Sequence, residues 1–136
     1  MRRSVETGPL YSAVAAGRAP HCTVSAEGSQ WQIDYRFAAA AALRVTRDVS
    51  IEYTDYAATV TWPAGPDAQA LLARAEHAAF SPAGCGIDWK RPETRATNAV
   101  PPGRQRIWRG SACNCQARVV EDSAGRVLAF GLRSAC

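Results

Sequence analysis

The sequence predicts an α+β fold, an antiparallel sheet of about five or six strands with one main helix packed on one face. Three observations support this prediction. Residues 29–37 alternate apolar and polar side chains with a period of two, the pattern of a half-buried strand. Residues 67–80 instead gather apolar side chains on one side of a helix. Residues 113–136 form a predicted β-hairpin around an Asp-Ser-Ala-Gly turn.

Length and composition indicate one domain, residues 1–136, which is large enough to fold without metal or cross-links. No run approaches the roughly 18 apolar residues of a membrane span, so no membrane contact is expected. The N-terminus lacks the apolar core of a signal peptide, which favours a cytoplasmic protein. The odd number of cysteines, five, fits reduced thiols better than a disulfide framework.

The N-terminal part, residues 1–28, is predicted to hold one short helix followed by a loop. Pro9 suits the first position of a helix that ends before Gly17. Residues 17–28 contain Gly, Pro and Ser and are expected to be a loop. The sequence shows no internal repeat.

The first strands form a predicted meander with one solvated face. Trp31, Ile33, Tyr35 and Phe37 make the apolar face of the strand at residues 29–37. Short strands are expected at residues 43–46 and 49–53, followed by a turn at 54–57 and a strand at 58–62. Three or four antiparallel strands result.

The main helix is predicted at residues 67–80. Pro66 and Asp67 suit its first turn, and residues 81–84 end it. Its Leu71, Leu72 and Ala75 side is expected to pack on the apolar face of residues 29–37. Residues 85–103 contain three prolines and little periodicity, which predicts a long surface loop.

The C-terminal end is predicted to be a strand at residues 104–109 and a hairpin at 113–135. Gly125 suits the left-handed position of its turn. Such a turn would place Asp122 opposite Arg126 and Val120 opposite Leu128.

Four cysteines, Cys85, Cys113, Cys115 and Cys136, are interpreted first as buried structural thiols. On a strand, Cys113 and Cys115 lie about 6.6–6.8 Å apart, the upper limit for a disulfide. Each has an alternative disulfide partner among the other cysteines, including Cys22. A zinc tetrad is disfavoured because the paired knuckle spacing is absent, so neither metal nor cofactor is expected.

Catalysis has weak support in the sequence. The only histidines are His21 and His77, and neither is placed beside a nucleophile. No nucleophile-elbow, zinc-protease or phosphate-loop motif occurs. We therefore lean against an enzyme, although two carboxylates can meet in any fold.

The charge is uneven along the chain. Residues 84–136 carry nine basic and four acidic side chains, whereas residues 1–83 carry seven basic and eight acidic ones. An acidic partner for the second half would explain this asymmetry, and a solvated basic face is the simpler alternative. Arginine binds phosphate or carboxylate groups, and arginine and tryptophan are common hot-spot residues of protein interfaces. The expected partner-binding residues are therefore Trp89, Arg91, Arg95, Arg104, Arg106, Trp108 and Arg109.

The function expected from these features is a small non-catalytic protein-binding or inhibitor protein that docks on an acidic partner surface. An immunity or anti-defence product, or another bacterial accessory protein, would fit. The alternative is a nucleic-acid-binding accessory protein that uses the same basic face. Charge reversal at Arg104 and Arg106 is expected to weaken binding and leave the fold intact, because exposed charges add little stability.

Overall fold

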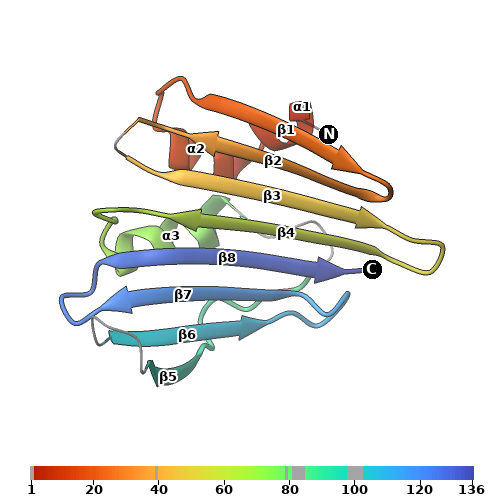
Figure 1. Ribbon diagram of the computed structural model, residues 1–136. Helices are drawn as coiled ribbons and strands as arrows, with labels where there is room; N and C mark the ends of the chain where they lie inside the picture. Colours follow the sequence, from red (N-terminus) through yellow and green to blue (C-terminus); the bar gives the residue numbers. More distant parts are fainter. Residues whose placement is uncertain (1, 39, 79, 81–84, 98–102) are drawn as a thin grey trace.

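A computed structural model describes residues 2–38, 40–78, 80, 85–97 and 103–136, with the side chains of 95–97 left out. Its described strands form one antiparallel sheet in the order β1-β2-β3-β4-β8-β7-β6-β5 (Figure 1). The strands are β1 (His21–Glu27), β2 (Gln30–Arg36), β3 (Ala42–Val49), β4 (Thr54–Thr61), β5 (Glu93–Thr97), β6 (Gly103–Arg109), β7 (Gln116–Asp122) and β8 (Val127–Ala135). The predicted fold class is therefore wrong, because the described part of the chain is mostly β, with one sheet of eight strands and only short helices.

The two strands that the sequence analysis missed lie at the two edges of the sheet. Strand β1 falls in residues 17–28, expected to be a loop, and β5 falls in the expected loop 85–103. Six of the seven β1 residues are exposed, so this strand buries no apolar face. An edge strand of this kind lacks the alternation that reveals strands nearer the centre.

The separate strand predicted at residues 49–53 does not form, because Val49 is the last residue of β3 and residues 50–53 connect β3 with β4. The Ser50 hydroxyl accepts a hydrogen bond from the Tyr53 amide at 3.1 Å, and Ile51 is fully exposed. The alternation of Val49, Ile51 and Tyr53 is therefore not a sign of burial. The predicted turn at 54–57 lies inside β4, which is continuous from Thr54 to Thr61.

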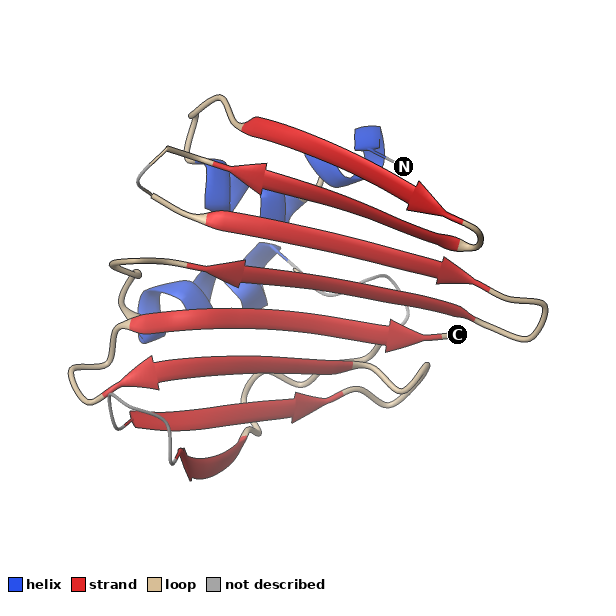
Figure 2. Ribbon diagram, viewed as in Figure 1, coloured by secondary structure: helices blue, strands red, loops and turns tan. Residues whose placement is uncertain are grey.

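The helices are α1 (Arg2–Glu6), α2 (Pro9–Ala15) and α3 (Ala68–Ala78), and all of them cover the same face of the sheet (Figure 2). Positions for α2 and α3 agree with the sequence, and the Asp67 carboxylate accepts a bond from the Ala70 amide at 3.2 Å. None of the described helices is long and apolar enough to cross a membrane.

Helix α3 does not pack on the apolar face of residues 29–37, where the sequence predicted it, because α2 lies there. Tyr11 of α2 packs edge-on against Tyr35 and Phe37, with ring centroids 5.2 and 5.6 Å apart. Helix α3 lies behind β4 and β8 instead (Figure 1). Its buried leucine is Leu71, 5% exposed, whereas Leu72 is only partly buried.

The sheet has a pseudo-twofold organisation that the sequence does not reveal. In each half, a four-stranded meander follows helical structure, α1 and α2 in the first half and α3 in the second. The last strands of the halves, β4 and β8, pair antiparallel. Equivalent strands begin 72 to 74 residues apart: β1 begins at residue 21 and β5 at 93, and β3 begins at 42 and β7 at 116. Strands β3 and β7 share the pattern Arg-Val-x-x-Asp, at residues 44–48 and 118–122.

The core lies between the sheet and its helices. Ile33, Tyr35, Val60, Val119 and Phe130 are completely buried on this face. The opposite face carries mainly polar or small residues, with Ile107 and Val120 as apolar exceptions. The sheet thus has one dry and one largely solvated side, as antiparallel sheets commonly do. Side chains near the centre of the dry face are buried, and this limits which predicted site residues remain accessible.

The C-terminal hairpin agrees with the sequence except in its register. Gly125 has φ +79°, and the Asp122 amide donates to the Arg126 carbonyl at 2.9 Å. A bulge between Val120 and Glu121 shifts the pairing, so Val120 lies opposite Ala129 and not Leu128. The bulge gives Glu121 the place opposite Val127.

Four cysteines are joined in two disulfides, Cys85–Cys115 and Cys113–Cys136, and Cys22 is free. The structure therefore differs from the sequence-based interpretation of these four residues as reduced thiols. Cys113 precedes β7 and adopts a left-handed backbone, φ 56°, so it does not share a strand with Cys115. Within the described residues, no three His, Cys, Asp or Glu side chains gather as a metal site would require.

Candidate functional site

The two tryptophans of the predicted partner-binding surface belong to the core. Trp108 is 1% exposed, and its indole N–H donates to the Trp89 carbonyl at 2.9 Å. The Trp89 ring is partly buried against Trp108 and Phe130, with centroids 5.4 and 6.4 Å away. Trp108 is therefore closed to stacking on a nucleic-acid base, and the Trp89 ring stacks on Phe130.

Arg104 and Arg106 share the face of Trp108, as predicted, but this is the dry face of the sheet. Both guanidinium groups bind the same oxygen of Glu121, with Arg106 Nε 2.8 Å from Oε1. The Glu121 side chain is 1% exposed, and its other oxygen, Oε2, has no hydrogen-bond partner within the described part of the chain. These arginines neutralise a buried carboxylate, so they are not an unoccupied docking surface.

The remaining predicted residues are dispersed. Arg109 pairs with Glu93 across β5 and β6 at 3.4 Å, and Arg91 pairs with Asp88 at 3.6 Å. The side chain of Arg95 lies outside the described residues. The structure therefore divides the six described residues of this set among an aromatic cluster, a buried ion cluster and exposed ion pairs.

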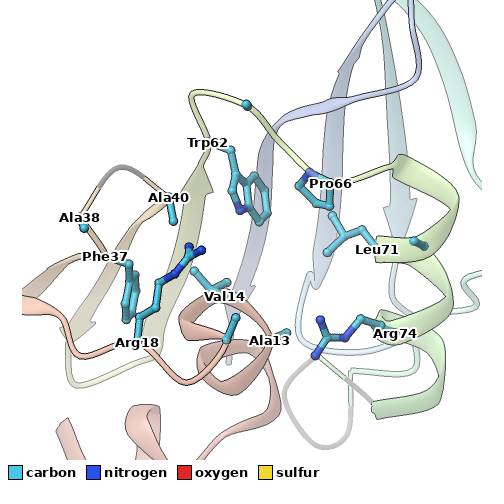
Figure 3. Close-up of a pocket in the computed structure, with 13 residues that line it drawn as sticks. Ala13, Val14, Arg18, Phe37, Ala38, Ala40, Trp62, Pro66, Leu71 and Arg74 are labelled. Atoms are coloured by element: carbon cyan, nitrogen blue, oxygen red, sulfur yellow. The ribbon is translucent and has the colours of Figure 1, made fainter.

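A different region has the geometry of a binding site, namely a pocket of about 620 Å³ between α2 and α3 (Figure 3). Its walls come from the two helices and from the segments that follow β2 and β4, so residues distant in the sequence meet here. They are mostly apolar and small: Ala13, Val14, Ala16, Arg18, Phe37, Ala38, Ala40, Trp62, Ala64, Pro66, Ala70, Leu71 and Arg74. Ligand pockets are typically 300–1,000 Å³ and apolar with a few polar groups.

Two arginines approach this pocket from opposite sides (Figure 3). Ala16, with φ 50°, ends α2 in the left-handed conformation and directs the chain toward Arg18. Arg74 lies one turn after Leu71 on α3, so both side chains occupy one side of that helix. Both arginines are exposed, and neither has an ion-pair partner among the described acidic residues.

The described lining of the pocket contains no Asp, Glu, His, Ser or Cys. A general base or a nucleophile of the usual kind is therefore missing from these walls. What the arrangement can do is hold an apolar group against Trp62 and Leu71 and attract negative charge with two guanidinium groups. Sequence reasoning missed this site because Arg18 and Arg74 are isolated in the sequence and Trp62 looked like an ordinary core residue.

Shifted pKa values occur mainly around the first half of the sheet. Burial, with the nearby charge of Glu6, raises the pKa of Tyr35, and burial also raises the pKa of Tyr56. Partial burial would raise the pKa of Asp34, but bonds from Arg44 and Gln32 outweigh it and lower that pKa. Arg44 Nε lies 2.8 Å from Asp34 Oδ1, an exposed pair on the solvated face.

Comparison with protein-family models, curated proteins and solved structures finds no match to this chain.

Proposed function

We propose that this protein is a small non-catalytic binding protein that holds an acidic segment of a partner protein in the pocket between α2 and α3. An apolar side chain of the partner would contact Trp62 and Leu71, and flanking carboxylates would bind Arg18 and Arg74. The observation that carries the proposal is the pair of arginines on either side of an apolar pocket. The acidic partner expected from the sequence is thus retained, but its docking place is a different surface.

A protein partner is favoured over nucleic acid. The nucleic-acid alternative relied on Trp89 and Trp108, but Trp108 is buried and Trp89 is partly buried against it. Binding to a phosphate backbone needs a track of several cations, and the pocket has two. Apolar walls with arginines beside them are instead typical of protein interfaces, where an anchor side chain fills a pocket.

An inhibitor or immunity role fits a protein that acts by occupying a partner surface, because the pocket walls offer no catalytic group. The two disulfides favour an oxidising compartment. We therefore propose such a compartment in place of the cytoplasm expected from the sequence.

A fluorescent aromatic sulfonate, anilinonaphthalene sulfonate, tests the pocket directly, because it combines an apolar ring system with one negative charge. We expect the wild type to enhance its fluorescence and the Arg18→Glu/Arg74→Glu variant to lose most of that enhancement. The matched control is Arg118→Glu/Arg133→Glu, which makes the same charge change at exposed positions on the solvated face of the sheet. Equal loss in both variants would refute a local site.

Peptides test the partner class. Twelve-residue peptides with one Phe or Leu between acidic residues should displace the dye, and the same peptides with Lys in place of the acids should not. Displacement should weaken with added salt, since the guanidinium–carboxylate contacts are screened. Displacement by random-sequence DNA but not by the acidic peptides would favour the nucleic-acid alternative.

A further inference from the structure

Strand β1 ends the sheet with an uncovered edge. It is the outermost strand of the sheet, and it pairs only with β2 among the described strands (Figure 1). Six of its seven residues are exposed, and Val24 is one of the few large apolar side chains at the surface, 50% exposed. Such an edge presents free backbone donors and acceptors to another strand.

Most of the features that normally protect an edge are absent from β1, whose only acidic residue is Glu27. It contains no Pro, Lys or Arg, and its pairing with β2 runs through all seven residues without a bulge. The opposite edge is different, because β5 has five residues and directly follows Pro92. Natural sheets blunt their edges with short strands, proline and charge, so β1 is the edge left open for pairing.

The sequence of β1 is complementary to itself when reversed about Val24. In an antiparallel pair centred there, His21 meets Glu27 of the second copy, and Thr23 meets Ser25 of the second copy. On the other face, Cys22 meets Ala26 of the second copy, and the two Val24 side chains meet on the axis. Polar residues thus oppose polar ones, small apolar residues oppose small apolar ones, and the one acidic residue faces a histidine.

We infer that two copies of this chain associate through β1, antiparallel and centred on Val24, so that their two eight-stranded sheets continue as one. The twofold axis is perpendicular to the sheet, so the helices of both copies lie on the same side. The contact is isologous and closed, which removes both open β1 edges and buries Val24 against Val24 of the second copy. The pocket between α2 and α3 is not part of this contact.

Sedimentation equilibrium of the whole chain tests the association. The wild type should show the mass of two chains, falling to that of one on dilution. Val24→Lys should show one chain at all concentrations, because two ammonium groups would face each other on the axis. Val49→Lys is the matched control, since Val49 is 45% exposed at the far end of β3, and it should remain a dimer.

A designed cross-link tests the register. Ala26→Cys should give a disulfide-linked dimer under mild oxidation, because the new thiol lies opposite Cys22 of the second copy. Ala26→Cys with Cys22→Ser should not cross-link, since equivalent positions at residue 26 are four residues out of register. Peptide mapping by mass spectrometry identifies the bond.

A wild type that sediments as a monomer throughout, or a Val24→Lys variant that stays dimeric, would overturn the inference. A dimer whose Ala26→Cys variant shows no bond between residues 22 and 26 would overturn the proposed register. Either result is compatible with normal dye binding at the pocket between α2 and α3. The dimer inference can therefore be refuted without refuting the proposed function.

Discussion

Removing Arg106 should destabilise the fold strongly, in contrast to what its place in a basic, alternating sequence suggests. Its side chain is 15% exposed and lies 2.8 Å from the carboxylate of Glu121, which is 1% exposed. Breaking a buried ion pair from one side typically costs about 3–5 kcal/mol, because the remaining charge stays buried. Arg104 still binds the same oxygen, so the lower end, about 3 kcal/mol, is expected for Arg106→Ala.

That cost can be converted to a melting temperature. An unfolding entropy of about 2.1 cal/mol/K per residue gives roughly 0.3 kcal/mol/K for a chain of 136 residues. A loss of about 3 kcal/mol therefore lowers Tm by about 10 °C. Scanning calorimetry and urea unfolding both measure it, and they should agree if unfolding is two-state.

Two variants make the test specific. Arg118→Ala, on the neighbouring strand β7 but exposed on the other face, should change the free energy of unfolding by less than about 0.5 kcal/mol. Arg106→Met combined with Glu121→Leu should be more stable than Arg106→Ala, because no unneutralised buried carboxylate remains. If Arg106→Ala unfolds like the wild type, Glu121 is not held as a buried carboxylate by these arginines, and the reasoning is wrong.

Three further outcomes are expected. Leu71→Ala should cost about 2–5 kcal/mol in urea unfolding, because Leu71 is buried where α3 meets the sheet; a cost near zero would mean that α3 is peripheral. Replacing both Cys85 and Cys115 with Ala should cost about 3–4 kcal/mol, as chain entropy gives for a loop of this length, and reductant should then have a smaller effect on this variant than on the wild type. Burial raises the pKa of Tyr35, so the stability that this residue contributes is complete below the ordinary tyrosine pKa of about 10 and is lost as pH rises through the folded-state pKa. The urea midpoint of Tyr35→Phe should therefore fall less between pH 9 and 11 than that of the wild type. An equal fall in both proteins would mean that other groups cause it.

The sequence predicted those elements whose local chemistry is decisive. Gly125 permits the left-handed turn of the last hairpin, and Asp67 caps α3, so both elements were located correctly. Strand β1 could not be found this way, because an exposed edge strand has no buried face to impose alternation. The shared Arg-Val-x-x-Asp of β3 and β7 was too short to reveal the repeated topology.

The candidate site was harder to predict for a different reason. Alternation showed correctly that Arg104, Arg106 and Trp108 share a face, but it does not say which face meets the core. The face that meets the core is set by Trp108 and by Glu121, which is distant in the sequence. The pairing of Glu121 depends on a bulge between β7 and β8 that no residue pattern predicts. Arg18 and Arg74 come together only because α2 and α3 lie side by side on one sheet face.

The seam between β4 and β8 has a consequence for how the chain folds. Every other described strand pairing joins neighbours along the chain, whereas the seam joins residues as distant as Asp55 and Ala135. Contacts between distant segments form late, because the intervening chain must be ordered first. Each meander should therefore assemble before the seam closes, and substitutions at Ala58 or Leu132 should speed unfolding more than they slow folding. Both disulfides join residues of the second half of the chain, so oxidation can complete there first and give the first meander a rigid edge on which to dock.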